Sequence, residues 1–188
     1  MHGGLSTNSN AEQFVNEMVM TIISESSRTA FRSEGQISGF IVGRFVREDK
    51  GVIINSEVTT PIKYRAENGL LRENPEGRYG DIDLQIILND TDKIYLELEY
   101  PRGTGREQVN FKNHIQRDLI KLNAVKDSVL TSVLIFDYKN YDDFDHHDEI
   151  KKIAANQGKT WIVHVRLPYK GEDIGKWEKR VTVRKPEE

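Results

Sequence analysis

Apolar residues recur at helical spacing in two parts of the chain. The first part predicts a helix from residue 11 to about residue 32, with Asn10 as its N-cap. The second part predicts a helix from about residue 107 to residue 126. The apolar residues that define these faces are Phe14, Met18 and Ile22 in the first helix, and Phe111, Ile115, Leu119 and Leu122 in the second. Each helix therefore has one face suited to packing on a sheet.

Shorter segments rich in Val and Ile, separated by turn residues, predict strands. The expected strands cover 37–46, 51–60, 83–88, 93–100, 129–138 and 160–167, with a further helix over 142–157 and a loop over 65–80. Pro61 is expected to end the second strand. Helices placed between strands after an initial hairpin predict a three-layer α/β/α domain, in which a mixed sheet has helices on both faces.

The size and composition of the chain suit one compact domain. It has 188 residues, of which 37% are hydrophobic and 30% charged, so we expect a single domain over 1–188 with residues 1–10 flexible. The absence of cysteine excludes disulfide scaffolds, thiol nucleophiles and thiolate zinc sites, so any metal is held by oxygen or imidazole. Neither a signal peptide nor a membrane-spanning run is recognisable, and we expect a soluble, cytoplasmic protein without a membrane partner.

Charge is distributed unevenly along a chain whose formal net charge is −3. Residues 81–99 contain six acidic side chains and one basic side chain, a local charge of −5. The segments 101–126 and 166–185 each have a local charge of +4. Such a layout suits a polyanion bound through metal ions, because carboxylates hold the cation while basic flanks attract phosphate. The alternative is that these charges are ordinary solvated faces.

The acidic segment contains a candidate catalytic cluster. Side chains alternate along a strand, so Glu97 and Glu99 point from the same face of the strand over 93–100. Asp83 opens the preceding strand, and the return of the predicted hairpin brings it to the same end. Carboxylates this close repel unless a proton or a divalent cation lies among them, and hard oxygen donors suit Mg²⁺ or Mn²⁺. The alternative is an exposed strand face that carries acidic residues.

These residues and the order of elements around them resemble the PD-(D/E)XK nuclease superfamily, the restriction-endonuclease-like fold. The resemblance covers residues 11–138. The family motif is an Asp at a strand start, a spacer, and then (Asp/Glu)-x-Lys; here Gly80-Asp81-Ile82-Asp83-Leu84 precedes Glu97-Leu98-Glu99. The resemblance implies a Mg²⁺- or Mn²⁺-dependent endonuclease that hydrolyses DNA phosphodiester bonds, of the type II restriction kind. Paired cuts in a duplex need two sites, so a homodimer is expected.

The resemblance also implies roles for individual residues. Asp83 and Glu97 would bind the metal, and the Leu98 carbonyl would complete its ligand set. Glu99 lies where the family has its catalytic lysine, and this is where the sequence departs from the family pattern. A few restriction enzymes look similar in having Glu-x-Glu at this place, and their last carboxylate is thought to activate water or bind a second metal.

A basic residue of the helix over 107–126 is a candidate replacement for the missing lysine. His114, Arg117 and Lys121 lie on a polar stripe of this helix, well away from its apolar face. Lys121, or else Arg117, would steady the attacking hydroxide or the phosphate. The alternative is that both are ordinary solvated charges, four residues apart on a helix.

Two further acidic residues are candidate helpers. Asp81 lies two residues before Asp83 and points the same way, but Asp83 is preferred because the apolar run begins directly after it. Glu25 lies in the stripe of the first helix, and some of these nucleases add a first-helix Glu to the site. A frayed and exposed helix end is the simpler explanation of Glu25.

Basic residues of 101–126 and 166–185 are expected to contact the DNA backbone, chiefly Arg102, Arg106 and Lys112. Two other functions fit the same fold. A non-catalytic nucleic-acid-binding module would keep these basic flanks, and the change of Lys to Glu99 would then mark lost chemistry. A protein-interaction module would use the acidic cluster as a binding face.

Overall fold

The computed structural model describes residues 10–46, 51–67, 70–100, 106–137 and 158–186. Its helices are α1 (Asn10–Ser26), α2 (Glu34–Phe45), α3 (Arg106–Ala124) and the short 3-10 helix η3 (Trp177–Arg180). Its strands are β1 (Val52–Glu67), β2 (Leu70–Glu73), β3 (Arg78–Leu88), β4 (Asp92–Glu99), β5 (Leu130–Asp137), β6 (Trp161–Arg166) and β7 (Val181–Arg184).

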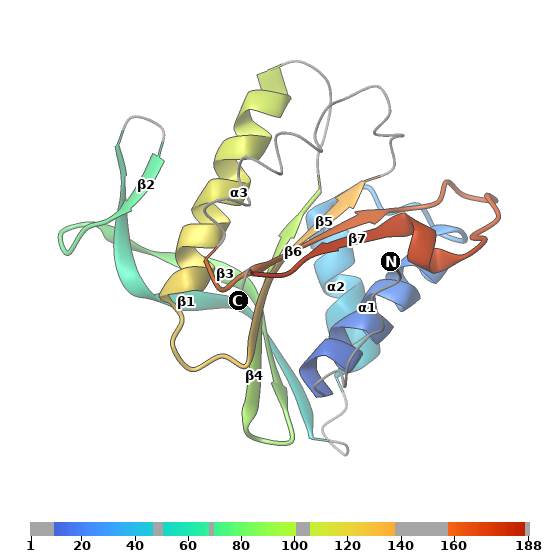
Figure 1. The fold of residues 1–188 in the computed structure, drawn as a ribbon, viewed down its shortest axis with the longest axis horizontal. Helices are drawn as coiled ribbons and strands as arrows, with labels where there is room; N and C mark the ends of the chain where they lie inside the picture. Colours follow the sequence, from blue (N-terminus) through green and yellow to red (C-terminus); the bar gives the residue numbers. More distant parts are fainter. Residues whose placement is uncertain (1–9, 47–50, 68–69, 101–105, 138–157, 187–188) are drawn as a thin grey trace.

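The strands form one seven-stranded sheet in the order β2-β1-β3-β4-β5-β6-β7 (Figure 1). The pairs from β2 to β4 are antiparallel, β4-β5 and β5-β6 are parallel, and β7 returns antiparallel to β6. Parallel neighbours need a crossover connection, and α3 supplies it between β4 and β5. The predicted mixed sheet is therefore confirmed, together with the hairpin of β3 and β4.

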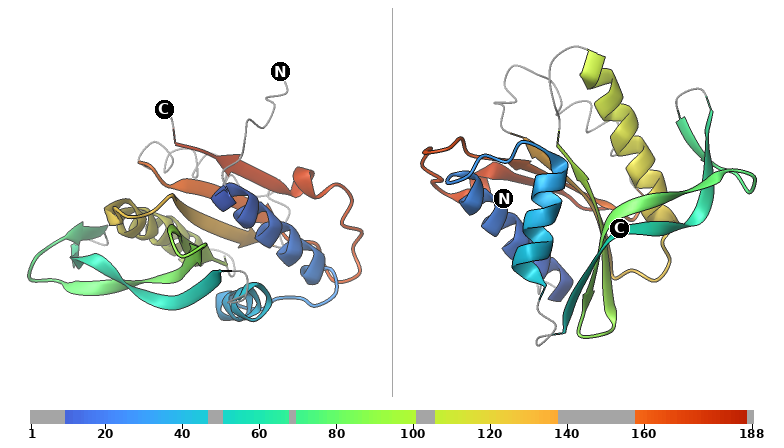
Figure 2. Two further views of the ribbon diagram at one scale, coloured as in Figure 1. Left: turned by 90° about the horizontal axis from the view of Figure 1, so that it is seen from below. Right: turned by 180° about the vertical axis from the view of Figure 1, so that it is seen from behind.

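Helices cover both faces of the sheet, as Figures 1 and 2 show. One core lies between the sheet and the pair α1 and α2, and includes Met18, Ile41 and Leu96. The second core lies under α3 and includes Ile115 and Leu119 from the predicted apolar face of that helix. The layered α/β arrangement is confirmed. No helix in the described ranges is long and apolar enough to cross a membrane.

The segment expected as a strand over 37–46 is instead the helix α2. Its buried residues Ile37, Ile41 and Phe45 are four positions apart, which is a helical period. The Ser33 side chain caps the helix by accepting the Gln36 backbone N–H at 3.3 Å. The prediction of a strand relied on β-branched and glycine content and ignored this spacing.

Three other boundaries were wrong. α1 ends at Ser26, short of residue 32. β1 continues past Pro61 to Glu67, because a register irregularity between Thr59 and Lys63 accommodates the proline, which cannot donate a ladder hydrogen bond. The expected loop over 65–80 contains the end of β1, the strand β2 and the start of β3. The expected helix over 142–157 lies outside the described residues.

The exposed glycines of α2 give a stability test. A Cβ built at Gly39 has nothing within 4 Å, and the residue lies in the interior of the helix. Because alanine has a higher helix propensity, Gly39→Ala should raise the free energy of unfolding by about 0.5–1 kcal/mol in urea denaturation. Gly77→Ala is the control, since its Cβ would lie 2.2 Å from the Tyr64 carbonyl oxygen and should destabilise the protein. A loss of stability in Gly39→Ala would contradict the helix.

Candidate active site

Side chains along β1 and β3 switch to the opposite face of the sheet at one point. At that point Glu57 of β1 lies opposite Asp83 of β3. Leu84 packs in the core under α1 and α2, whereas Ile82, two residues earlier, packs in the core under α3. Regular alternation would place both on one face. Glu57 has a positive φ of 53°, and the register between the two strands is the same on either side of it. The break in the alternation of side chains along β3 therefore occurs at Asp83.

Asp83 lies where β3 and β4 separate. The ladder between these strands ends at the pair Leu84 and Leu96. Beyond it, the Leu98 backbone N–H donates to Asp83 Oδ2 at 2.7 Å, in place of a backbone carbonyl. The half-buried carboxylate is thus held between two strands by the backbone itself, which fixes its position without a mobile partner.

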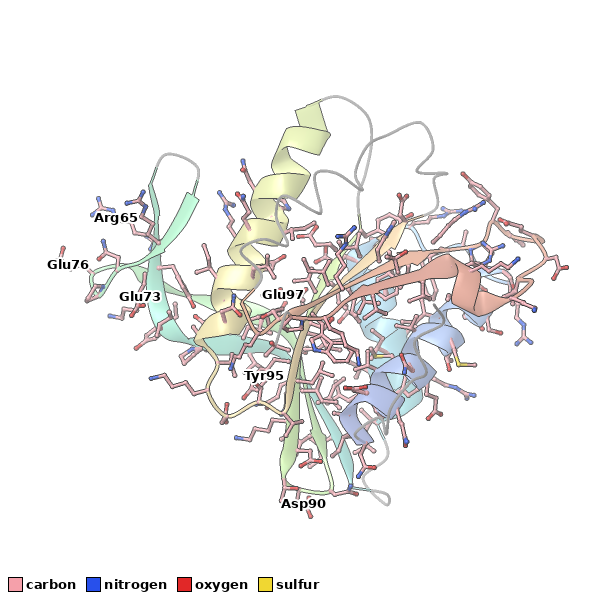
Figure 3. The ribbon with its side chains drawn as sticks, in the orientation of Figure 1. Arg65, Glu73, Glu76, Asp90, Tyr95 and Glu97 are labelled. Carbon is pink, nitrogen blue, oxygen red and sulfur yellow. The ribbon has the colours of Figure 1, made fainter. Side chains whose placement is uncertain are left out.

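Glu97 is the most buried acidic side chain of the site, with 2% of its surface exposed. It lies in the interior beside α3, far from Asp90 at the end of the hairpin (Figure 3). The Lys121 ammonium group contacts Glu97 Oε1 as an ion pair. Lys121 Nζ also lies 2.9 Å from Asp118 Oδ1 and donates to the Asp81 carbonyl at 3.1 Å. One lysine therefore connects β3, β4 and α3.

Glu99 and Asp118 form the second part of the cluster. Both are buried, and their carboxyl groups are in hydrogen-bonding contact. Such a contact requires one of the two to carry a proton. His114 Nδ1 lies 3.7 Å from Glu99 Oε1 on the more open side. The predicted common face of Glu97 and Glu99 is confirmed, since both meet residues of α3.

Burial shifts the protonation of these groups. Burial, reinforced by the negative charge of Asp118, raises the pKa of Glu99 to about 10. Burial also raises the pKa of Glu97 well above its usual value, and Lys121 opposes that shift in part. The pKa of Asp83 is raised by burial and lowered less strongly by the Leu98 N–H. Burial acts to lower the pKa of Lys121, but the carboxylates of Asp118 and Glu97 outweigh it and raise this pKa.

The structure brings together five of the expected residues and separates others, with Glu99 joined to the cluster through Asp118. Asp83, Glu97, Leu98 and Lys121 are mutual neighbours through the contacts above. The Asp81 side chain is exposed, and only its carbonyl reaches Lys121.

Glu25 does not join the cluster, because it lines a separate pocket with residues of α1 and α2. Arg117 does not join the cluster through any hydrogen bond or ion pair among the described residues, and its buried Nε has no hydrogen-bond partner. Arg102 lies outside the described residues, as do the side chains of Arg106 and Lys112.

Sequence reasoning missed two residues beside the cluster. Asp118 adjoins the apolar face of α3 and lies three residues before Lys121, a spacing that indicates a helical ion pair. Tyr64 is buried, and its hydroxyl has no hydrogen-bond partner. Burial and the charge of Glu73 raise the pKa of Tyr64 to about 12. No sequence signal identifies Tyr64. Its part of β1 follows a proline that was expected to end the strand, so no face of a sheet was predicted for it.

A groove of about 600 Å³ gives access to Asp83 from the other side of the sheet. It runs between α2 and the strands, and Asp83 and Leu98 line it from the sheet. Gly39 lines it from α2, whereas Glu34 and Glu57 add negative charge. Because these carboxylates repel negative charge, an anionic ligand would bind in this groove only together with a cation.

The donor chemistry fits a hard divalent cation. Asp83, Glu97 and the Leu98 carbonyl offer oxygen donors of the kind Mg²⁺ takes, and the excess of carboxyl groups over Lys121 leaves charge to neutralise. Within the described ranges, no three His, Asp or Glu side chains group as a metal-binding set. A site made of two carboxylates and one backbone carbonyl contains fewer than three such side chains, so it is compatible with this finding.

No known protein family, curated protein or solved structure matches this chain. The function is therefore argued from its own residues.

The raised pKa of Glu99 gives a prediction for metal-free protein. Between about pH 4.5 and pH 10 the folded state keeps a proton that the unfolded state loses, so stability falls as the pH rises. Glu99→Gln removes this penalty, and should match wild type near pH 4.5 and exceed it increasingly toward pH 8.5 in thermal melts. Glu172→Gln is the control: Arg180 lowers the pKa of Glu172, so its difference from wild type should stay constant above pH 5. A constant difference for Glu99→Gln would refute the assignment.

Proposed function

We propose that this chain is a metal-dependent endonuclease that hydrolyses phosphodiester bonds in DNA, on a restriction-endonuclease-like fold with Mg²⁺ or Mn²⁺ as cofactor. One observation carries the proposal. Asp83 is held by a backbone N–H in the gap between two separating strands, beside Glu97 and the ammonium group of Lys121. Paired acids with an adjacent lysine are the groups that metal-assisted phosphodiester hydrolysis uses. The mixed sheet with helices on both faces supports the proposed fold.

Asp83, Glu97 and the Leu98 carbonyl would hold the cation. When bound, it lowers the pKa of a water molecule and stabilises charge on the phosphate. Glu99 would orient the attacking water through its carboxyl group, and it could accept a proton only where the positive charge of the bound cation lowers its raised pKa. Its partner Asp118 keeps the Glu99 carboxyl directed at the site, because the two groups are in contact.

Lys121 takes the role of the lysine that is missing from the Glu97-Leu98-Glu99 tripeptide. It comes from α3 instead of β4, yet its ammonium group reaches Glu97. A cation there stabilises the negative charge that develops on the phosphate oxygens. A homodimer with one site for each strand of the duplex is part of the proposal.

A non-catalytic nucleic-acid-binding module is the second candidate. It is favoured by the ion pair itself, because Lys121 already balances part of the charge that a metal ion would neutralise at Glu97. Titration calorimetry with Mn²⁺ separates the two candidates: saturable binding that is lost in Glu97→Gln supports the nuclease, and no binding supports the module.

Cleavage of supercoiled plasmid tests the nuclease directly. Wild type should cut with Mg²⁺ or Mn²⁺ and not with EDTA. Asp83→Asn retains an acceptor for the Leu98 N–H but loses the charge, so we expect its cleavage to fall at least about 100-fold while DNA binding is kept. Glu99→Ala should also lose cleavage.

Glu99→Lys, which restores the family tripeptide, separates the remaining outcomes. Cutting by Glu99→Lys but not by wild type would indicate a nuclease scaffold that has lost its activity. Cutting by Asp83→Asn at the wild-type rate would refute the site. Failure of wild type and all variants to cut would favour the protein-interaction module.

The ion pair at Glu97 gives a stability prediction. Lys121→Met leaves two buried carboxylates without their cation, and should lower the free energy of unfolding by about 3 kcal/mol at pH 8 without metal. Mn²⁺ should stabilise this variant more than wild type in thermal melts, because the cation no longer competes with Lys121 for Glu97. Lys93→Met is the control: its pair with Asp127 is exposed, so we expect little change. Equal Mn²⁺ effects in wild type and Lys121→Met would contradict competition at Glu97.

A further inference from the structure

A three-stranded arm extends from the sheet beyond α3. It consists of β2, residues 63–67 of β1 and residues 78–80 of β3, paired antiparallel. Both views in Figure 2 show it at the side of the molecule opposite the connection between α1 and α2. Arg65 and Glu73 of the arm, and Glu76 of the turn between β2 and β3, are labelled in Figure 3.

The two faces of the arm differ in character. Tyr64 is buried, and Gly80 approaches Lys121 of α3, so these positions face α3 and the acidic cluster. Glu73 pairs with Tyr64 and lies on the same inner face. Because side chains alternate, the neighbouring positions Lys63 and Tyr79, which pair with each other, point to the outer face.

The outer face is basic. Arg65 and Arg72 are directly opposite each other across β1 and β2, next to Lys63, and both arginines are exposed. Lys63 Nζ lies 5.4 Å from the centre of the Tyr79 ring, which is 55% exposed, and this cation-π contact helps to hold the ammonium group on the outer face.

The outer face leads to the groove that contains Asp83. Gly80 and Ile82 of β3 face α3, so Tyr79 and Asp81 between them face the side of the sheet that carries α1 and α2. The groove between α2 and the strands opens on that same side. Measured along the strands at about 3.3 Å per residue, Tyr79 lies at most about 13 Å from Asp83, and the Arg65–Arg72 pair at most about 20 Å from it.

We infer that the outer face of the arm binds the backbone of a nucleic-acid duplex on one side of the cleavage position. This inference rests on the proposed function, in which the cation held at Asp83 defines where the cut occurs. With one phosphate per 3.4 Å of each strand, Tyr79 and the arginine pair would meet phosphates within about four and within about six base steps of the cut. Asp81 lies nearer the site on this face and limits the basic surface to the arm.

Salt-dependent binding in EDTA tests the arm independently of cleavage. The anisotropy of a labelled DNA duplex of about 30 base pairs, titrated between about 50 and 200 mM salt, gives the number of phosphate contacts from the slope. The variant Arg65→Gln/Arg72→Gln removes two contacts, so its slope should be smaller by about 1.8 and its affinity at about 0.1 M salt about 60-fold weaker. The matched control is Arg28→Gln/Arg32→Gln, with the same charge change at exposed positions between α1 and α2.

The outcomes distinguish failure of the inference about the arm from failure of the proposed nuclease function. A smaller salt dependence of binding in the arm variant, but not in the control, supports the inference. This holds even if wild type never cuts DNA, in which case only the proposed nuclease function fails. Equal slopes in wild type and the arm variant overturn the inference even if cleavage is observed. Equal losses in the arm variant and the control also overturn it, because binding then reflects net charge. Absence of duplex binding by wild type overturns both.

Discussion

Burial of carboxyl groups around a single ammonium group is the constraint on which the centre of this protein depends. Glu97 and Asp118 pair with Lys121 where the strands and α3 converge, while Asp83 adjoins Glu97 and Glu99 contacts Asp118, and all four carboxyl groups are partly or fully removed from water. Buried ions need partners, so the cluster holds protons, the lysine or an added cation, and each alternative changes both stability and chemistry. The raised pKa values of Asp83, Glu97 and Glu99 and the proposed metal site therefore have one physical origin.

The same region determines how the sheet is divided. Where Glu57 stands opposite Asp83, the strands reverse the faces of their side chains, and the ladder between β3 and β4 ends. On one side of this point the strands form the core under α1 and α2, and on the other they continue into the arm. The carboxylate of Asp83 accepts the N–H that the separating strands leave unpaired. The site and the basic outer face of the arm are thus consequences of one local break.

α2 shows how a short helix creates access without weakening the core. Its apolar positions at intervals of four residues bury one face, while its glycines leave the opposite side open along the groove. Larger side chains there would narrow the route to Asp83 and Leu98. Glycine costs helix stability, so an open groove and a more stable helix are in conflict at these positions.

Periodicity in the sequence by itself determined the β3-β4 hairpin, α3, the buried β5 and the common face of Glu97 and Glu99, because these depend on neighbours within one element. It failed for α2, whose glycines and β-branched residues resemble a strand, and for β2, whose pairing with β1 is not encoded by alternation. Only the tertiary structure decided that Lys121 reaches Glu97, that Asp118 meets Glu99, and that Glu25 stays apart. The reason is that these contacts join residues from different elements, and their distances are set by packing between layers rather than by spacing along the chain.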